Sequence, residues 1–189
     1  MGFKLSMAHM NEILKEWSKQ YLVYAPKVFK NGATYSDTDL IRYGLVETIE
    51  EVEFDRKSEY SFKEILLPIT QTLFYFTEEE VKEPDPPQKG AIVFLRSCDI
   101  HSLKILDQMY LENGFSDYYY KRLRERVKFI LIGCPTAFES CFCVDMGCNQ
   151  TDDYDYYIEI KDGFVYADSK NEEWDALFQS RSSTADVTP

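Results

Sequence analysis

The sequence has few basic residues and no long hydrophobic stretch. Its 189 residues include 21 lysines and arginines against 33 aspartates and glutamates, which gives a formal net charge of −12. Proteins that bind nucleic acids need a basic surface to displace phosphate counterions, so we expect no nucleic-acid partner. No apolar run approaches the roughly 20 residues that cross a bilayer, so we also expect no membrane partner. The first four residues do not begin a signal peptide, which predicts a cytoplasmic protein.

The usual sequence motifs for nucleotide binding are also absent. No G-x-G-x-x-G follows a predicted strand and no P-loop occurs, so nothing predicts a nucleotide site of these types. Apolar residues make up 44% of the chain and aromatic residues 15%. This composition excludes a largely disordered protein and predicts a folded domain with a substantial core.

Cysteine is missing from the first 97 residues and from the last 41. All five cysteines lie in the middle of the chain: Cys98, Cys134, Cys141, Cys143 and Cys148. An odd number of cysteines in a chain without a signal peptide argues against a secreted disulfide framework. Their clustering indicates a single site.

Hydrophobic periodicity predicts an α/β fold of the mixed α+β type. An amphipathic stripe predicts an N-terminal helix over Ser6–Tyr21. Continuous apolar runs near 91–96 and 128–133 predict two strands that are buried on both faces. A helical segment over Asp99–Leu111 joins them into a central βαβ unit with parallel strands. Near the C-terminus, two alternating segments joined by Asp162-Gly163 predict a β-hairpin.

Other segments are less regular. Tyr21–Phe29 is rich in aromatic and β-branched residues but contains Pro26, which predicts one or two short edge strands. Asp37–Tyr43 is interpreted as a short helix. Residues 1–179 are predicted to form one α/β domain, and residues 180–189 a tail or linker.

Four of the cysteines are expected to converge in this topology. Cys98 follows the first buried strand, Cys134 follows the second, and α/β sheets place their sites at the carboxyl ends of strands. Cys141 and Cys143 come a few residues later. Thiolates bind iron–sulfur clusters, usually four per cluster, and would also suit zinc, although a Cys-x-Cys pair is short for a zinc knuckle. Cys98 precedes Asp99, a predicted N-cap, so the helix dipole would favour a thiolate there.

Other interpretations of these residues stay open. Free cysteine is among the most buried residue types, so each thiol would also suit a hydrophobic core, and Cys148 is assigned to that role. A reactive thiol of low pKa that acts as a redox switch is a further alternative. His101 lies in the first turn of the helix after Cys98, where it either tunes a cofactor or is a solvated histidine.

Three groups of motifs are specific enough to suggest a family. They are Phe62–Pro68 with Thr72–Phe74, Arg96–Lys104 with Leu106–Asp107, and Cys134 followed by Cys141–Gly147. Together they resemble the iron–sulfur electron-transfer subunit of anaerobic sulfite reductase, and the wider family is similar to the electron-transfer β subunits of soluble hydrogenases. The resemblance implies an electron-transfer protein that has no complete active site. Such a protein takes electrons from a flavin- and NADH-binding subunit and passes them to a sirohaem subunit, which reduces sulfite to sulfide.

The resemblance also implies the cofactor and its ligands. Cys98, Cys134, Cys141 and Cys143 would hold a [4Fe–4S] cluster. Members of the family continue into a ferredoxin-like domain whose Cys-x-x-Cys-x-x-Cys-x-x-x-Cys-Pro runs hold two [4Fe–4S] clusters. No such run occurs here, so residues 180–189 are expected to lead toward an absent C-terminal domain. The alternatives are a cluster-free scaffold that docks redox partner subunits through aromatic and acidic surfaces, and the β subunit of a hydrogenase-like complex.

Overall fold

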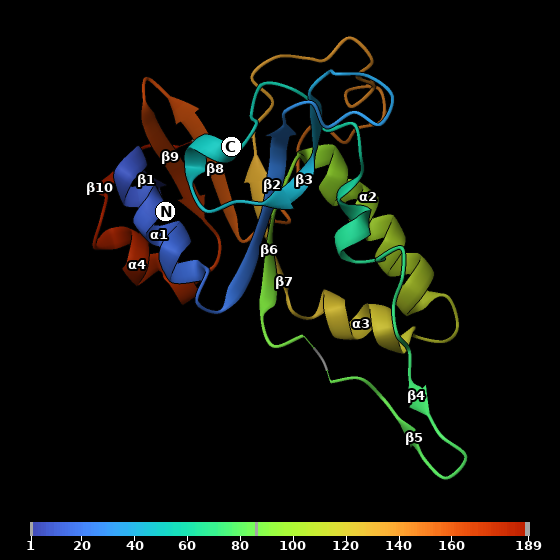
Figure 1. Ribbon diagram of the computed structural model, residues 1–189. Helices are drawn as coiled ribbons and strands as arrows, with labels where there is room; N and C mark the ends of the chain where they lie inside the picture. The colour runs from blue at the N-terminus through green and yellow to red at the C-terminus, as the bar shows by residue number, and fades with distance from the viewer. Residues whose placement is uncertain (1, 86, 188–189) are drawn as a thin grey trace.

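A mixed β-sheet with helices on both faces forms the body of the computed structural model, which describes residues 2–85 and 87–187 (Figure 1). Within these residues the sheet has eight strands in the spatial order β10-β1-β9-β8-β7-β6-β2-β3. Its strands are β1 (Gly2–Ser6), β2 (Tyr21–Phe29), β3 (Leu40–Leu45), β6 (Gly90–Leu95), β7 (Val127–Ile132), β8 (Tyr156–Lys161), β9 (Phe164–Ser169) and β10 (Ser183–Thr184). The predicted fold class is confirmed.

Four α-helices and several shorter elements complete the described chain. The helices are α1 (Met7–Trp17), α2 (Ser97–Asp107), α3 (Tyr118–Arg124) and α4 (Asp175–Gln179). The shorter elements are the 3₁₀ turns η1 (Ile49–Glu51), η2 (Phe62–Ile65) and η4 (Glu172–Trp174), the π-helical turn η3 (Gln108–Glu112), and a separate strand pair, β4 (Tyr75–Phe76) and β5 (Val81–Lys82). Among the described residues, no helix combines the length and the apolar character needed to span a bilayer.

Strands β2, β6, β7 and β8 run parallel in the centre of the sheet. The last four residues of β6 are at most 1% exposed, because neighbouring strands cover both edges and helices cover both faces. The strands predicted near 91–96 and 128–133 are observed at Gly90–Leu95 and Val127–Ile132. Their predicted parallel pairing around a helical crossover is confirmed. The carboxyl ends of β6 and β7 therefore lie at the same edge of the sheet.

Alternate residues of the central strands face two separate cores. Ile92 and Ile130 belong to the core that includes α1 and α4, and Val93 and Leu131 belong to the core that includes α2 and α3. Figure 1 shows these two helix pairs on opposite sides of the sheet. Full burial of one such side chain stabilises the fold by roughly 1.5–3 kcal/mol. Both layers of helices are therefore held on the sheet by apolar contacts.

The predicted N-terminal helix and C-terminal hairpin are both present. Helix α1 begins after Ser6, whose side chain accepts a hydrogen bond from the His9 N–H at 3.2 Å, and it ends at Trp17, somewhat before the predicted end. Strands β8 and β9 are joined by Asp162 and Gly163, whose φ angles are 52° and 74°. Positive φ at both central residues is typical of the two-residue turns that match the twist of an antiparallel pair.

Two local predictions are wrong. Strand β2 is a single strand between β6 and β3, not one or two edge strands. Only Tyr21–Tyr24 of β2 pair with β6. Pro26 lies beyond this paired part, so its missing N–H costs no hydrogen bond to β6. The Pro26 carbonyl accepts a hydrogen bond from Glu53 N–H at 2.7 Å. The helix predicted at Asp37–Tyr43 is replaced by β3, because Leu40–Leu45 pair with β2 along their whole length.

Part of the predicted tail belongs to the sheet. Ser183 and Thr184 form β10 and pair with Lys4 and Phe3 in β1. The domain boundary near residue 179 and the continuation into a further domain stay predictions. Residues 188–189 lie outside the described residues.

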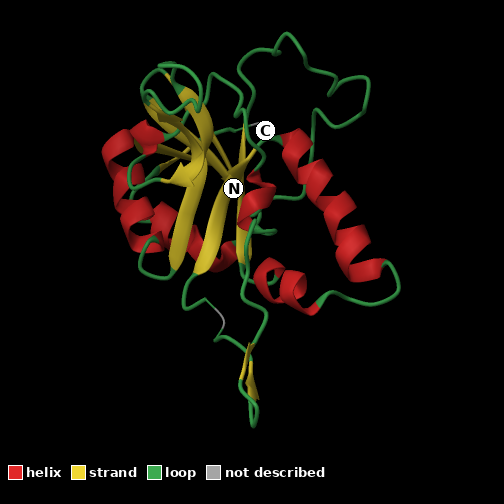
Figure 2. Cartoon of the chain, turned by 45° about the vertical axis from the view of Figure 1, so that its right-hand side comes forward, coloured by secondary structure: helices red, strands yellow, loops and turns green. Residues whose placement is uncertain are grey.

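Strands β4 and β5 form an arm that projects from the body of the domain (Figures 1 and 2). We define the arm as residues 73–83. At its base, Tyr119 Oη donates a hydrogen bond to the Leu73 carbonyl at 2.8 Å. The large apolar side chains of the arm are exposed by 44–74%: Leu73, Phe74, Tyr75, Phe76 and Val81. Because an isolated strand pair is only marginally stable in water, this apolar arm is a candidate contact surface.

We predict that Ile130→Ala lowers the free energy of unfolding by about 2–5 kcal/mol, because Ile130 is fully buried in the central strand β7 and alanine leaves a cavity. The matched control is Ile105→Ala on α2, where the side chain is 59% exposed and the change should be within about 0.5 kcal/mol. Urea denaturation followed by circular dichroism measures both. Similar effects of the two substitutions would contradict the buried position of β7.

Candidate functional site

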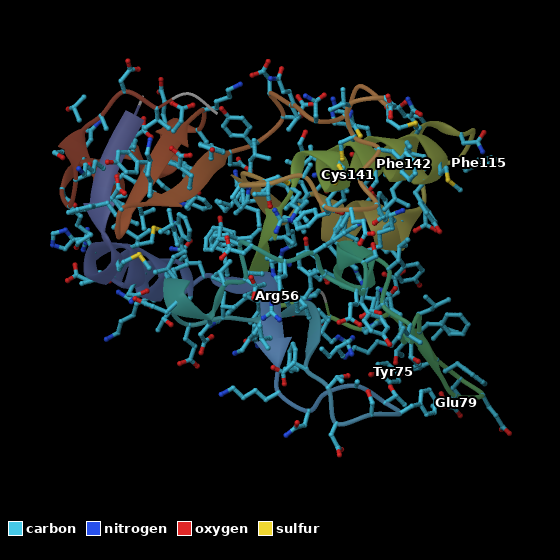
Figure 3. The ribbon with its side chains drawn as sticks, turned by 90° about the horizontal axis from the view of Figure 1, so that it is seen from above. Arg56, Tyr75, Glu79, Phe115, Cys141 and Phe142 are labelled. Carbon is cyan, nitrogen blue, oxygen red and sulfur yellow. The ribbon has the colours of Figure 1, made fainter. Side chains whose placement is uncertain are left out.

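A cavity of about 390 Å³ at the carboxyl ends of β6 and β7 is lined by all five cysteines. Cys98 comes from the first turn of α2 and Cys134 from the residues after β7. Cys141, Cys143 and Cys148 lie further along the same long loop, which joins β7 to β8. The four cysteines that the sequence singled out therefore share one cavity, and Cys148 joins them. Figure 3 shows Cys141 and its neighbour Phe142 near α2.

None of the five thiols is buried. Cys134 and Cys141 are exposed, and Cys98, Cys143 and Cys148 are partly exposed. The interpretation of Cys148 as a buried core residue is therefore wrong, because its side chain lines an open cavity and not a hydrophobic core. Apolar packing does not explain why the other four cysteines lie here either. All five are free thiols in the structure.

The surroundings of Cys98, Cys141 and Cys143 shift the pKa values of these three thiols. The backbone N–H and the thiol of Cys143 both donate to the Cys141 sulfur, which lowers the pKa of Cys141. The same thiol contact, together with burial, raises the pKa of Cys143. Burial and the adjacent Asp99 carboxylate raise the pKa of Cys98. Binding of a metal centre would therefore have to displace protons from Cys98 and Cys143, because the thiolate is the ligand.

The loop between β7 and β8, which carries four of the cysteines, is tied to the start of α2. Ser97 Oγ donates a hydrogen bond to the Cys148 carbonyl at 2.9 Å, and His101 Nε2 donates to the Gln150 carbonyl at 2.9 Å. Within the loop, Cys148 N–H donates to the Cys143 carbonyl at 2.8 Å. His101, for which the sequence left two roles open, thus positions the cysteine loop in this structure.

The polar residues around Cys98 differ from the sequence expectation. The N-cap of α2 is Arg96, and Asp99 lies in the first turn, so the prediction of Asp99 as N-cap is wrong. Asp99 instead accepts a hydrogen bond from Tyr43 Oη at 3.2 Å. Burial raises the pKa of Asp99, although the hydrogen bond from Tyr43 and the charge of Arg96 oppose this shift. Cys98 is therefore flanked by the partly buried, hydrogen-bonded Asp99 on one side and by the cavity on the other.

Arg96 is a site residue that sequence reasoning missed. Its side chain is only 4% exposed, and it is the one charged side chain classed as buried among the described residues. Arg96 Nη1 donates to the Cys134 sulfur at 3.2 Å and to the Gly133 carbonyl at 3.2 Å. The available signal was an arginine directly after a buried strand and two residues before Cys98.

The donors at the cavity are thiols, which are the ligands of iron–sulfur clusters and also suit zinc. Five thiols line the cavity, and a [4Fe–4S] cluster takes four, each bound to a different iron. Among the described residues, no three histidine, cysteine, aspartate or glutamate side chains form a group that could hold one metal ion. The choice of Cys98, Cys134, Cys141 and Cys143 as ligands stays a prediction.

Comparison with known proteins gives one weak relationship. No protein-family model and no solved structure matches the sequence. Over 188 residues the chain is 28% identical to sulfhydrogenase 2 subunit beta of Pyrococcus furiosus, a match that covers 98% of this chain and 53% of that protein. The chain thus spans about half the length of this curated relative. The similarity is weak homology to a subunit of a hydrogenase-type oxidoreductase, and it does not extend to a named sulfite reductase.

Proposed function

We propose that this chain is an electron-transfer subunit that binds an iron–sulfur cluster in the cysteine-lined cavity and carries out no bond chemistry itself. The observation that carries the proposal is that all five cysteines, from the start of α2 and from the loop between β7 and β8, line one cavity at the carboxyl ends of β6 and β7. The weak homology to a sulfhydrogenase β subunit supports the same class of function.

In this proposal Cys98, Cys134, Cys141 and Cys143 hold a [4Fe–4S] cluster, which supplies one-electron transfer when bound. Ser97 and His101 hold the cysteine loop against α2 through the Cys148 and Gln150 carbonyls. The loop also carries exposed apolar side chains next to the cavity: Phe142, Val144 and Met146, which are 68–77% exposed. A partner protein that covers these side chains would exclude water and come within electron-transfer distance of the cluster.

The more specific proposal concerns the partners. The sequence motifs favour a flavin- and NADH-binding protein as the electron donor and a sirohaem protein that reduces sulfite as the acceptor. The homology favours a hydrogenase-like complex instead. Both versions give this chain the same task, which is to relay electrons between two other subunits.

The alternative of a cluster-free scaffold is favoured by one observation. The arm exposes five large apolar side chains, and its tip carries the acidic run Glu78–Glu80. Tyr75 and Glu79 lie on the arm, well separated from Cys141 (Figure 3). A partner that covers the arm would therefore not need to contact the cysteine cavity.

One prediction of the proposed function concerns the cofactor. Anaerobically reconstituted protein should contain about four iron and about four acid-labile sulfide per chain, measured by colorimetric iron and sulfide assays and by EPR after reduction. Replacing any one of Cys98, Cys134, Cys141 or Cys143 by serine should lower both contents at least severalfold, because serine is a poor ligand for these irons. Cys148→Ser is the matched control and should retain the cluster. Stoichiometric zinc without sulfide would contradict the proposal.

A further prediction distinguishes the cluster-binding role from the cluster-free scaffold role. Phe76→Glu together with Val81→Glu should weaken binding of the partner subunits at least tenfold, about 1.4 kcal/mol, while iron content stays unchanged. Cys98→Ser should lower the iron content and leave the binding of the partner subunits unchanged. Co-purification of the assembled complex and iron analysis measure the two effects. Electron transfer that continues unchanged in the Cys98→Ser complex would favour the cluster-free scaffold.

The third prediction concerns the electron acceptor. The cluster-loaded chain is first reduced with dithionite, and the excess reductant is removed. Its cluster should then be reoxidised when sulfite is added together with a sirohaem sulfite reductase protein. The visible absorbance of the cluster follows this reaction. Reoxidation by a hydrogenase-type partner, with none by the sirohaem protein, would replace the sulfite reductase assignment with the hydrogenase-like one.

A further inference from the structure

Arg96 occupies an unusual position for a charged residue. The residue follows the carboxyl end of the central strand β6 and is only 4% exposed. Among the ion pairs that the described residues form, none involves Arg96. Burying a charge costs free energy unless other groups compensate it. The contacts of the guanidinium therefore indicate the role of Arg96.

The two terminal nitrogens of the guanidinium bind different segments of the chain. Nη1 donates to the Gly133 carbonyl and to the Cys134 sulfur, each at 3.2 Å. Nη2 donates to the Phe54 carbonyl at 2.7 Å and to the Arg56 carbonyl at 3.1 Å. The flat group also lies over the Phe138 ring, 4.9 Å from its centroid. Only the planar fork of arginine makes contacts of this kind in two directions at once, so lysine would not reproduce them.

The sulfur contact bears on the cofactor. We propose that Arg96 is a positioning residue that raises the reduction potential of the cluster through its charged hydrogen bond to the Cys134 sulfur. The inference rests on the proposed function, with Cys134 as a ligand. A reduced cluster carries one more negative charge than the oxidised cluster. A buried positive charge and an N–H directed at a ligand sulfur therefore stabilise the reduced form more than the oxidised form.

Arg96 also orients the ligand. Because Nη1 holds both the Gly133 carbonyl and the Cys134 sulfur, it fixes the direction in which the chain leaves β7. The Nη2 contacts to Phe54 and Arg56 keep the guanidinium itself from turning away. The carbonyls of Phe54 and Arg56 thus preorganise the hydrogen bond from Arg96 to the Cys134 sulfur.

The test is a redox titration of reconstituted wild-type chain and of Arg96→Gln, with dithionite as the electron source and EPR as the readout. Arg96→Gln should shift the equilibrium between oxidised and reduced cluster about tenfold toward the oxidised form, which is about 59 mV lower in midpoint potential for one electron. Arg96→Lys keeps the positive charge but lacks the planar guanidinium, so its midpoint potential should lie between those of the wild type and Arg96→Gln. Arg181→Gln is the matched control, because it removes an equal charge from a surface pair with Glu12 and does not touch the cavity.

A purely structural role for Arg96 would lower the melting temperature and leave the potential unchanged, and that result would overturn the inference while the proposed function stands. Failure of the wild-type chain to bind any iron–sulfur cluster would overturn both. If Arg96→Gln does not fold or does not hold iron, pulsed EPR of reduced wild-type chain labelled with ¹⁵N-arginine decides the question. A guanidinium nitrogen coupled to the cluster supports the inference, and no such coupling overturns it.

Discussion

The parallel pairing of β6 with β7 is the constraint on which the candidate site depends. It aligns Ala91–Leu95 with Val127–Leu131, so the chain leaves both strands at the same edge of the sheet. Cys98 and Cys134 line the same cavity there, although most of α2, all of α3 and more than thirty residues of sequence lie between them. The pairing is secured by burial on both faces, since alternate residues of the two strands belong to two different cores. Loss of either core would disturb the edge at which the thiols meet.

The remaining geometry of the site comes from polar contacts at the start of α2. Ser97 and His101 bind carbonyls of the cysteine loop, and Arg96 binds the segment that carries Cys134. A long loop between strands needs such anchors, because its backbone groups have no partner strand. The cavity beside these anchors is open to solvent, which is compatible with the proposed exchange of electrons with other proteins.

Two exposed apolar surfaces lie apart on the molecule. One is the cysteine loop with Phe142 and Met146, and the other is the arm with Phe76 and Val81. The proposed function requires contact with both a donor and an acceptor, and two separate surfaces would meet that requirement. The chain spans about half of the sulfhydrogenase subunit that it matches, so the remaining half of that protein has no counterpart in this comparison.

The sequence by itself determined the central βαβ unit, the N-terminal helix and the Asp162-Gly163 hairpin, because buried runs, helical periodicity and turn residues act locally. It also indicated one cysteine site, since the carboxyl ends of parallel strands meet. Only the tertiary structure decided that Pro26 lies inside the sheet in β2 and that β3 is a strand, because strand pairing between distant segments overrides local preference. It likewise decided that Cys148 lines the cavity and that Arg96 contacts Cys134, since both depend on how a long loop folds back onto α2.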